Sequence, residues 1–470
     1  MTTEPLATEP STATEPSTTT APPPSAPQPP RTLEALHLNP DLVSGLVLRH
    51  LAAVGTLSGA ALEARMGVPY EAFQPLLDEH IKSHFIEQGG YATVTPSEGR
   101  PVALRMNHVI SDAGRRRVAE LAETATRYLG PCPVNLETFV ELALRQEENA
   151  SAVTTSSLAT ALADLELEPG VLEEVGSAMA SRSSLFLYGP PGNGKSSIAR
   201  AMAHLLGGPI EVPYAIALGE EVIRVLDPMY HRPIVHEQSA DRRFARVARP
   251  VVRAGGELSF TQLELTHNQR ARYYEAPLQL KASGGVLVID DFGRQAESPV
   301  RLLNRFIVPM EEHVDFLDLA ATGHKVEVPF TCQVVFSTNL SPAELVDEAF
   351  LRRISYKVLV NDPTLEQYSR ILERECRRAG MALPPQAIPF LQELYKGRPM
   401  RGSHPRQLVA RIVDRARYRG EQPQITRESL QHAFDAYLNP AFLMDVRASY
   451  RALFTGGPLP PPPAPSQPTA

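Results

Sequence analysis

The stretch SSLFLYGPPGNGKSSIARAMAHLL, residues 183–206, decides the fold of this 470-residue chain. An apolar run, Leu185–Tyr188, enters a loop with the spacing G-x-x-x-x-G-K-S and leaves it as an amphipathic helix. Glycines in such a loop let successive backbone N–H groups turn toward phosphate oxygens without a Cβ in the way. The helix N-terminus adds the positive end of its dipole. The sequence therefore predicts an α/β domain with a phosphate-binding loop between strand and helix.

The loop matches the Walker A pattern in full, which is typical of sites for nucleoside triphosphates. Lys195 would place its charge on the β- and γ-phosphates, and the Ser196 hydroxyl would complete a Mg²⁺ shell. The alternative is a glycine-rich turn without a ligand, which the flanking strand and helix make the weaker interpretation. We therefore predict that the nucleotide is bound by Gly189, Pro190, Pro191, Gly192, Asn193, Gly194, Lys195, Ser196 and Ser197.

A second apolar run occurs in GGVLVIDDFGRQ, residues 284–295, and it ends in the carboxylates Asp290 and Asp291. Acids also end ordinary buried strands, so the run gains its meaning from the phosphate loop. With that loop present, Asp290 is predicted to hold Mg²⁺ and Asp291 to orient the attacking water. The long separation of Asp290 from Lys195 predicts an insert between the two motifs.

Two later segments resemble motifs of the AAA+ ATPases. QVVFSTNLSP, residues 333–342, resembles sensor 1, whose polar tip Asn339 would touch the γ-phosphate and the water. DEAFLRRISYKVLV, residues 347–360, resembles the segment that carries the arginine finger. Arg353 is the better match for the finger and Arg352 lies beside it, so the choice between them stays open.

RGSHPRQLVARIVDRARY, residues 401–418, is similar to the sensor 2 helix of the AAA+ lid, which places Arg406 over the nucleotide. Each residue alone has a plainer interpretation, such as a strand-end turn for Asn339 or a surface charge for an arginine. The joint order of the motifs over about residues 165–440 carries the resemblance, and the layout resembles the MoxR-like branch. The resemblance implies ATP and Mg²⁺ as cofactors and a homo-oligomeric ring, most often of six, in which Arg353 reaches the neighbouring nucleotide.

The sequence departs from the family pattern at Asp291, where most AAA+ proteins have glutamate. Aspartate is one methylene shorter, so its carboxylate would lie about a bond length further from the water. Misplacement of that order can cost about 100-fold in rate. We therefore expect an ATPase that forms ADP and phosphate slowly.

The insert is expected over about residues 209–270, and its first part alternates apolar and polar residues, which indicates strands. RARYYEAPLQLKA, residues 270–282, is predicted to be the helix that leads into the second apolar run. Tyr273 and Tyr274 could grip a polypeptide in a ring, although core packing is the favoured interpretation. Five arginines could bind an acidic partner or pair with acids of a neighbouring subunit, and the sequence does not choose: Arg242, Arg243, Arg246, Arg249 and Arg253.

Residues 33–130 resemble a winged helix-turn-helix domain. Helices are expected at 41–55 and 68–88, with a short segment at 58–67 between them. A hairpin at 90–111, turning at Ser-Glu-Gly, and a closing helix at 112–129 follow.

The charge of this block bears on its partner. The expected recognition helix carries Glu71, Asp78 and Glu79 against Lys82, whereas phosphate contacts need cations on that face. A protein partner is therefore favoured over DNA, and the run Arg115–Arg117 is the main argument for DNA.

The composition favours a protein of the reducing cytoplasm. It is 43% hydrophobic and 21% charged, and its net charge of −7 argues against a protein that coats nucleic acid. The three cysteines are far apart and lack C-x-x-C spacing, so neither a disulfide framework nor a zinc site is expected. No signal peptide is expected, because the Thr-, Glu- and Pro-rich N-terminus has neither a basic start nor an apolar core. No membrane insertion is expected, because no apolar run approaches about 18 residues. His231 and His236 lack a third ligand nearby, so we expect no metal beyond the Mg²⁺ of the nucleotide.

The expected function is an oligomeric, ATP-hydrolysing AAA+ protein that remodels an unknown protein client like a chaperone. The alternative is a nucleotide-gated regulator that binds DNA through its winged helix. Six segments are predicted: a disordered Thr/Pro-rich tail (1–32), a winged-helix-like domain (33–130), a helical linker (131–164), an AAA+ α/β core (165–360), a helical lid (361–440), and a terminal helix with a disordered Pro-rich tail (441–470).

Overall fold

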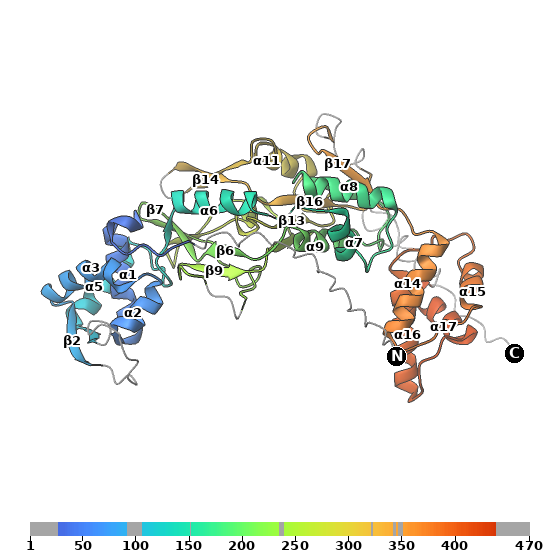
Figure 1. Cartoon of the computed structure of the whole chain (residues 1–470), viewed down its shortest axis with the longest axis horizontal. Coiled ribbons are helices and arrows are strands. Elements are labelled where there is room, and N and C mark those ends of the chain that lie inside the picture. Colours follow the sequence, from blue (N-terminus) through green and yellow to red (C-terminus); the bar gives the residue numbers. More distant parts are fainter. Residues whose placement is uncertain are drawn as a thin grey trace, which may run out of the picture.

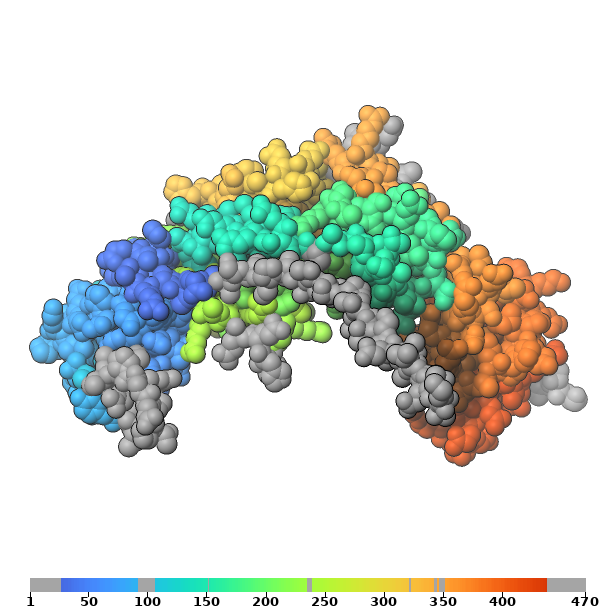
Figure 2. Space-filling model, in the orientation of Figure 1, coloured from blue at the N-terminus to red at the C-terminus, as the bar shows by residue number. Residues whose placement is uncertain are grey.

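The computed structural model describes residues 27–91, 106–150, 152–234, 239–320, 323–341, 345 and 351–438. Together they form an elongated arch, with an N-terminal domain at one end, an α/β body in the centre and a helical bundle at the other end (Figure 1). The space-filling view shows the two end domains as separate lobes that project to the same side of the body (Figure 2). Most of the predicted N-terminal tail, the whole segment 441–470 and the predicted Ser-Glu-Gly turn lie outside the described residues.

The central sheet has five parallel strands, as the α/β prediction requires. Its order is β10-β13-β16-β5-β17 (Val251–Ala254, Val286–Ile289, Gln333–Ser337, Leu185–Tyr188, Tyr356–Leu359). Alternate strand residues face two separate cores. One core packs against α7 (Thr155–Ala161), α8 (Pro169–Ala180) and α9 (Lys195–Leu205), and the other packs against α11 (Pro299–Glu312). Both apolar runs quoted from the sequence are therefore confirmed as strands buried on both faces.

Strand β10 corrects the predicted limits of the insert. It lies inside the range 209–270, yet it pairs in parallel with β13, with Arg253 opposite Val288. VVRA is a short run that contains an arginine, so its sequence did not distinguish a core strand from the strands of an insert. The insert therefore begins after α9 and ends before β10, and a second excursion follows β10.

A second five-stranded sheet combines both excursions with the linker. Its order is β11-β12-β8-β7-β4 (Thr266–Asn268, Tyr273–Glu275, Glu221–Arg224, Ala215–Leu218, Val134–Asn135). The predicted helical linker is thus helical only in part, at α6 (Leu136–Glu148) and α7, because β4 precedes them. The remaining pairs are β6 (Ile210–Pro213) with β9 (Phe244–Val247), and β14 (Val314–Leu319) with β15 (His324–Pro329).

The helix predicted over 270–282 is wrong for most of its length. Tyr273 and Tyr274 lie in β12, Pro277 caps the helix that follows, and only α10 (Leu278–Lys281) is helical. Tyr274 is fully buried, and the Tyr273 ring packs edge-on against Tyr128 at 6.3 Å. Core packing of the two tyrosines is therefore confirmed. The 3-10 helix η2 (Phe260–Leu263) precedes this region.

The N-terminal domain contains the expected helices and hairpin. After η1 (Glu34–Leu36), its elements are α1 (Pro40–Val54), β1 (Thr56–Ser58), α2 (Gly59–Met66), α3 (Tyr70–Lys82), β2 (Ile86–Tyr91), β3 (Met106–Ile110) and α5 (Asp112–Thr124). The strands form an antiparallel sheet of order β1-β3-β2. Helix α3 is shorter than predicted, because the chain turns at His84, whose φ is 59°, and continues as β2. Helix α5 likewise ends at Thr124 rather than at 129.

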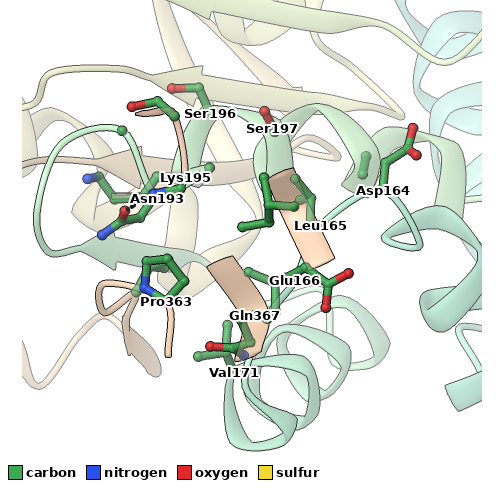
Figure 3. A pocket seen from close by; sticks show the side chains of 18 of the residues that line it. Asp164, Leu165, Glu166, Val171, Asn193, Lys195, Ser196, Ser197, Pro363 and Gln367 are labelled. Atoms are coloured by element: carbon green, nitrogen blue, oxygen red, sulfur yellow. Dashed lines mark hydrogen bonds between the residues drawn. The ribbon is translucent and has the colours of Figure 1, made fainter. Parts of the chain in front are cut away.

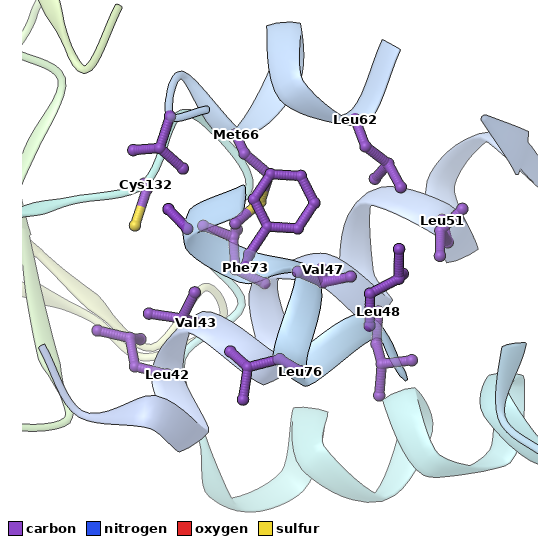
Figure 4. Packing of buried hydrophobic residues seen from close by; sticks show 14 of the residues in the cluster. Leu42, Val43, Val47, Leu48, Leu51, Leu62, Met66, Phe73, Leu76 and Cys132 are labelled. Carbon is purple, nitrogen blue, oxygen red and sulfur yellow. The ribbon is translucent and has the colours of Figure 1, made fainter. Parts of the chain in front are cut away.

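The N-terminal domain shares its core with the insert. Leu42, Val47, Phe73 and Cys132 pack within this core (Figure 4), and Ala217 of the insert belongs to the same buried cluster. Two hydrogen bonds also join the N-terminal domain to the second excursion: Arg127 donates its N–H to the Ala271 carbonyl at 2.9 Å, and the Arg272 guanidinium donates to the Thr124 carbonyl at 3.2 Å.

The lid is a bundle of α14 (Leu365–Arg378), α15 (Ala387–Leu394), α16 (His404–Arg419) and α17 (Arg427–Leu438). Thr364 and Gln367 form a capping box that starts α14 directly after the central sheet ends. The lid buries a core of its own around Tyr368, Leu391 and Leu408. None of the helices in the described part of the chain is long and apolar enough to cross a membrane.

Acid should destabilise the N-terminal domain because it buries three histidines. Burial lowers the pKa of His50, His80 and His108 below the usual 6.5. Their full contribution to stability is present above about pH 6.5, the unfolded pKa, and is lost as the pH falls, because unfolding then takes up protons. We expect the melting temperature to fall by several degrees from pH 7.5 to 5.5. His108→Phe should lessen that fall, whereas substitution of the exposed His37 should not; equal slopes for all three chains would contradict the prediction.

Candidate active site

A cleft of about 900 Å³ lies at the carboxyl edge of the central sheet, between the AAA+-like body and the lid. Figure 3 shows Asn193, Lys195 and Ser196 on one side of it, with Glu166, Val171 and Gln367 across from them. Parallel strands bring their carboxyl ends to one edge, so residues from three separate motifs meet there. Asp290, Asp291 and Asn339 also line the cleft.

The phosphate loop has the backbone that the sequence predicts. Gly192 and Gly194 have φ of 87° and 91°, a region that disfavours residues with a Cβ. A Cβ at Gly192 would also overlap the Ser403 hydroxyl of the lid. Lys195 begins α9 and donates to the carbonyls of Gly189 and Pro190 at 2.8 and 2.9 Å. The loop is thus closed by its own lysine.

The charge of Lys195 depends on its surroundings. Burial lowers the pKa of the Lys195 ammonium to about 8, although Asp290 and Asp291 oppose this effect. A polyanion in the cleft would favour the charged form further. The site therefore suits a ligand that carries several negative charges.

Ser196 and Asp290 contact each other in the cleft. The Ser196 hydroxyl donates to Asp290 Oδ2 at 2.9 Å and to Oδ1 at 3.2 Å. Burial alone would raise the pKa of Asp290, but hydrogen bonds from Arg253, Ser196 and Ser337 outweigh it and hold the pKa below its usual value. A hydroxyl beside an ionised carboxylate is an all-oxygen donor set that fits Mg²⁺.

Asn339 joins the lysine to the second acid. Its side-chain oxygen accepts from Lys195 Nζ at 2.9 Å, and its side-chain nitrogen donates to Asp291 Oδ1 at 3.2 Å. Asp291 has a left-handed backbone with φ of 49° and an exposed side chain. The carboxylate therefore faces the cleft with one oxygen positioned by Asn339.

The two candidate fingers do not line this cleft. Arg353 precedes β17 and so lies at the amino edge of the sheet, opposite the cleft, with Arg352 exposed beside it. Arg353 Nε pairs with Glu311 Oε1 at 2.9 Å, and both side chains are exposed. Within one chain, the structure thus separates the fingers from the other motif residues.

The lid contacts the phosphate loop through Asn193, which the sequence singled out only as part of the loop. The Asn193 amide donates to Asp362 Oδ1 at 2.8 Å and accepts from the Gly402 N–H at 3.0 Å. Asp362 lies between the sheet and α14, and Gly402 lies just before α16. Arg406, in the first turn of α16, lines the cleft as predicted.

Three ion pairs between the loop after α7 and helix α14 lie beside the cleft, and no pattern in the sequence indicated them. Glu166 pairs with Arg370 at 2.8 Å and with Arg374 at 3.2 Å, and Asp164 pairs with Arg378 at 2.7 Å. The three arginines are four residues apart on α14 and so share one face of that helix. We call these three ion pairs the strap.

Four of the five arginines that the sequence singled out have partners within the chain. Arg243 forms a buried pair with Asp241 at 2.7 Å, and Arg246 pairs with Glu211 at 3.2 Å. Arg249 donates to the Gly284 carbonyl, and Arg253 pairs with Asp290. The partners of these residues were distant or unremarkable in sequence. In the described part of the chain, no group of three His, Cys, Asp or Glu residues could hold a metal ion.

A family comparison covers the body of the arch. Residues 184–354 match the AAA domain (dynein-related subfamily). The central body is therefore similar to AAA domains over these residues. It has the P-loop α/β fold, and the parallel sheet described above agrees with this similarity. Residues 364–436, which form the lid, match a domain of unknown function (DUF8689).

Solved structures with similarity to the chain include two proteins at low sequence identity. NtrX from Brucella abortus in complex with ATP is 16% identical, with a TM-score of 0.36, over 62% of this chain and 64% of that chain. The RuvB Holliday junction branch migration motor from Thermotoga maritima is 14% identical, with a TM-score of 0.36, over 62% of this chain and 83% of that chain. The chain therefore spans less than two thirds of that NtrX chain. No curated protein matches the chain in sequence.

Proposed function

We propose that the chain binds Mg²⁺–ATP in the cleft and hydrolyses it. The observation that carries this proposal is one set of hydrogen bonds that joins Lys195, Asn339 and Asp291 beside the pair Ser196–Asp290. A charged lysine, a polar sensor and two carboxylates are the groups that phosphoryl transfer needs. A structural network alone would not need an exposed carboxylate that faces a large cleft.

The residues take the following roles in hydrolysis. Lys195 neutralises the β- and γ-phosphates, and the loop N–H groups hold their oxygens. Asp291 accepts a hydrogen bond from the attacking water while Asn339 fixes its carboxylate. Water attacks the γ-phosphorus and gives a proton to the Asp291 carboxylate while the bond to the bridging oxygen breaks, so that ADP and inorganic phosphate leave. Mg²⁺, held by Ser196 and Asp290, would supply positive charge to the phosphate oxygens.

Turnover should depend on Asp291. Asp291→Asn should keep ATP binding but lower kcat by about 100-fold, because a neutral amide can neither polarise the water nor take up its proton as a carboxylate does. Steady-state phosphate release at saturating ATP measures this. Asp318→Asn on the exposed face of β14 serves as the matched control. If wild type and Asp291→Asn release phosphate at the same rate, the chain is a nucleotide switch rather than an ATPase.

We further propose that the active form is a ring, in which Arg353 of one protomer completes the cleft of the next, and that it remodels a protein client. The separation of Arg353 from its own cleft supports a role between protomers. The exposed residues of α3 include Glu71 and Glu79, which supports a protein partner with basic segments. The MoxR-like branch and the winged helix remain part of this proposal, as do cytoplasmic location and a ring of six.

A DNA-binding regulator is the second candidate, favoured by the exposed arginines Arg115, Arg116 and Arg117 on α5. Titration of the full chain into a labelled duplex at low and high salt tests it. Salt-sensitive binding that is lost in the triple alanine variant would favour DNA. Absence of binding at low salt would remove this candidate.

Breaking the strap should release nucleotide faster. Glu166→Arg places like charges opposite Arg370 and Arg374, so we expect the fluorescent ADP analogue to dissociate about tenfold faster in stopped flow. Glu173→Arg, on the exposed face of α8, adds the same charge elsewhere and should leave the rate unchanged. The charge swap Glu166→Arg with Arg374→Glu should restore much of the wild-type rate. Equal rates for Glu166→Arg and wild type would contradict a role of the strap in holding the lid.

A further inference from the structure

The register of the central sheet places Arg253 beside Asp290. Arg253 stands opposite Val288 in the parallel pair, so both side chains point to the same face of the sheet. Asp290 follows Val288 by two residues and returns to that face. The Asp290 N–H donates to the Ala254 carbonyl at 2.8 Å, which fixes the spacing of the two strand ends. The contact between Arg253 and Asp290 is therefore set by the backbone.

The Arg253 guanidinium donates to the same Asp290 oxygen that accepts a hydrogen bond from the Ser196 hydroxyl. Arg253 lies 2.7 Å from Asp290 Oδ2, and the Ser196 hydroxyl lies 2.9 Å from the same atom. Ser196 and Asp290 are the residues that fit Mg²⁺. A guanidinium at this distance places its positive charge beside the carboxylate, where the charge of a divalent cation would otherwise lie. Arg253 and a divalent cation therefore compete for Asp290.

Arg253 has a second position available. Its side chain is 45% exposed, whereas that of Asp290 is 19% exposed, and β10 is an edge strand of the sheet. Glu257 follows in the next loop, where its Oε1 accepts from the Gly255 N–H at 2.8 Å. Backbone hydrogen bonds and the nearby charge of Arg253 lower the pKa of Glu257. An ionised partner thus lies within the electrostatic reach of Arg253.

We propose that Arg253 is a positioning residue that guards Asp290: it holds the carboxylate and competes with Mg²⁺, and it turns toward Glu257 when Mg²⁺–nucleotide binds. The inference rests on the proposed nucleotide site. It goes beyond that site because it assigns to Arg253 control over the Mg²⁺ concentration at which the site fills. A surface ion pair without this role would leave that concentration unchanged.

The test is a Mg²⁺ titration of the full chain with a fluorescent, non-hydrolysable ATP analogue, followed by anisotropy. Arg253→Gln should lower the Mg²⁺ concentration at half-saturation by about tenfold, because a charge-assisted hydrogen bond no longer competes. Arg253→Lys keeps the charge and should lie between the two. Glu257→Gln removes the second partner and should raise the half-saturating concentration. Arg301→Gln, which breaks the pair between Arg301 on α11 and Glu297 just before that helix, is the matched control.

The outcomes distinguish a failure of the proposed role of Arg253, called the guard here, from a failure of the proposed nucleotide site. If wild type binds the analogue and Arg253→Gln gives the same or a higher Mg²⁺ midpoint, the guard is overturned and the nucleotide site stands. If wild type binds no more analogue than Lys195→Ala at any Mg²⁺ concentration, the proposed function fails and the guard fails with it. If Arg253→Gln lowers the melting temperature, the Mg²⁺ midpoint of Glu257→Gln decides between the outcomes. A raised midpoint supports the proposed role of Arg253, and an unchanged midpoint overturns it.

Discussion

Arg353→Ala should lower kcat for ATP by about 10³-fold or more while the affinity for ATP stays the same. An arginine finger acts on the charge of the transition state and contributes little to binding of the ground state. The structure places Arg353 at the amino edge of the sheet, where it cannot serve its own cleft. Phosphate release and binding of a fluorescent ATP analogue, measured on the same samples, separate the two effects.

The control for Arg353→Ala removes Glu311, the partner of Arg353, and keeps the arginine. Glu311→Ala breaks the exposed pair with Arg353, which contributes at most about 1 kcal/mol to stability, and should leave kcat near the wild-type value. Mixing Arg353→Ala with Lys195→Ala should recover part of the activity, because an intact cleft then meets an intact finger. No recovery on mixing would contradict catalysis between protomers. Loss of activity in Arg352→Ala alone would assign the finger to Arg352.

Lys195→Ala should weaken ATP binding by about 100-fold and bring phosphate release to background, because several charge-assisted contacts are lost at once. The lysine also closes the loop through the carbonyls of Gly189 and Pro190, so its loss loosens the phosphate cradle. Lys325→Ala, on the exposed hairpin β14–β15, is the matched control. Calorimetric titration with ATP measures the affinity. A Lys195→Ala chain that binds ATP as tightly as wild type would place the nucleotide elsewhere.

The motifs that could be predicted from sequence are those whose neighbours are local. The pattern of strand, glycine loop and helix is visible within a few residues after Leu185–Tyr188. The strand that ends in Asp290 and Asp291 is likewise visible from its own apolar run. The structure then brings Lys195, Asn339 and Asp291 together because parallel strands share a carboxyl edge. Each strand could be predicted from its own segment, whereas the roles of the residues at the strand ends depended on the order of the motifs along the chain.

The residues that sequence reasoning missed depend on distant partners. Arg378 meets Asp164 across 214 positions, and Arg253 meets Asp290 through a strand of four residues that carries little apolar signal. Asn193 was identified as a loop residue, but its hydrogen bonds with Asp362 and Gly402 depend on the position of the lid. The helix predicted over 270–282 failed because β12 pairs with β11 and with β8 in the second sheet, and this pairing outweighed local helix propensity.

The shared core of the N-terminal domain and the insert has a mechanical consequence. A domain on a flexible tether would move independently of the body, whereas this one shares buried residues with it. A small rotation of the central body would therefore carry the N-terminal domain with it, and the displacement would grow with distance from the axis of rotation. The lid buries a core of its own and meets the body through hydrogen bonds and ion pairs at its surface. Motion between the body and the lid would thus break polar contacts, whereas motion between the body and the N-terminal domain would open a hydrophobic core.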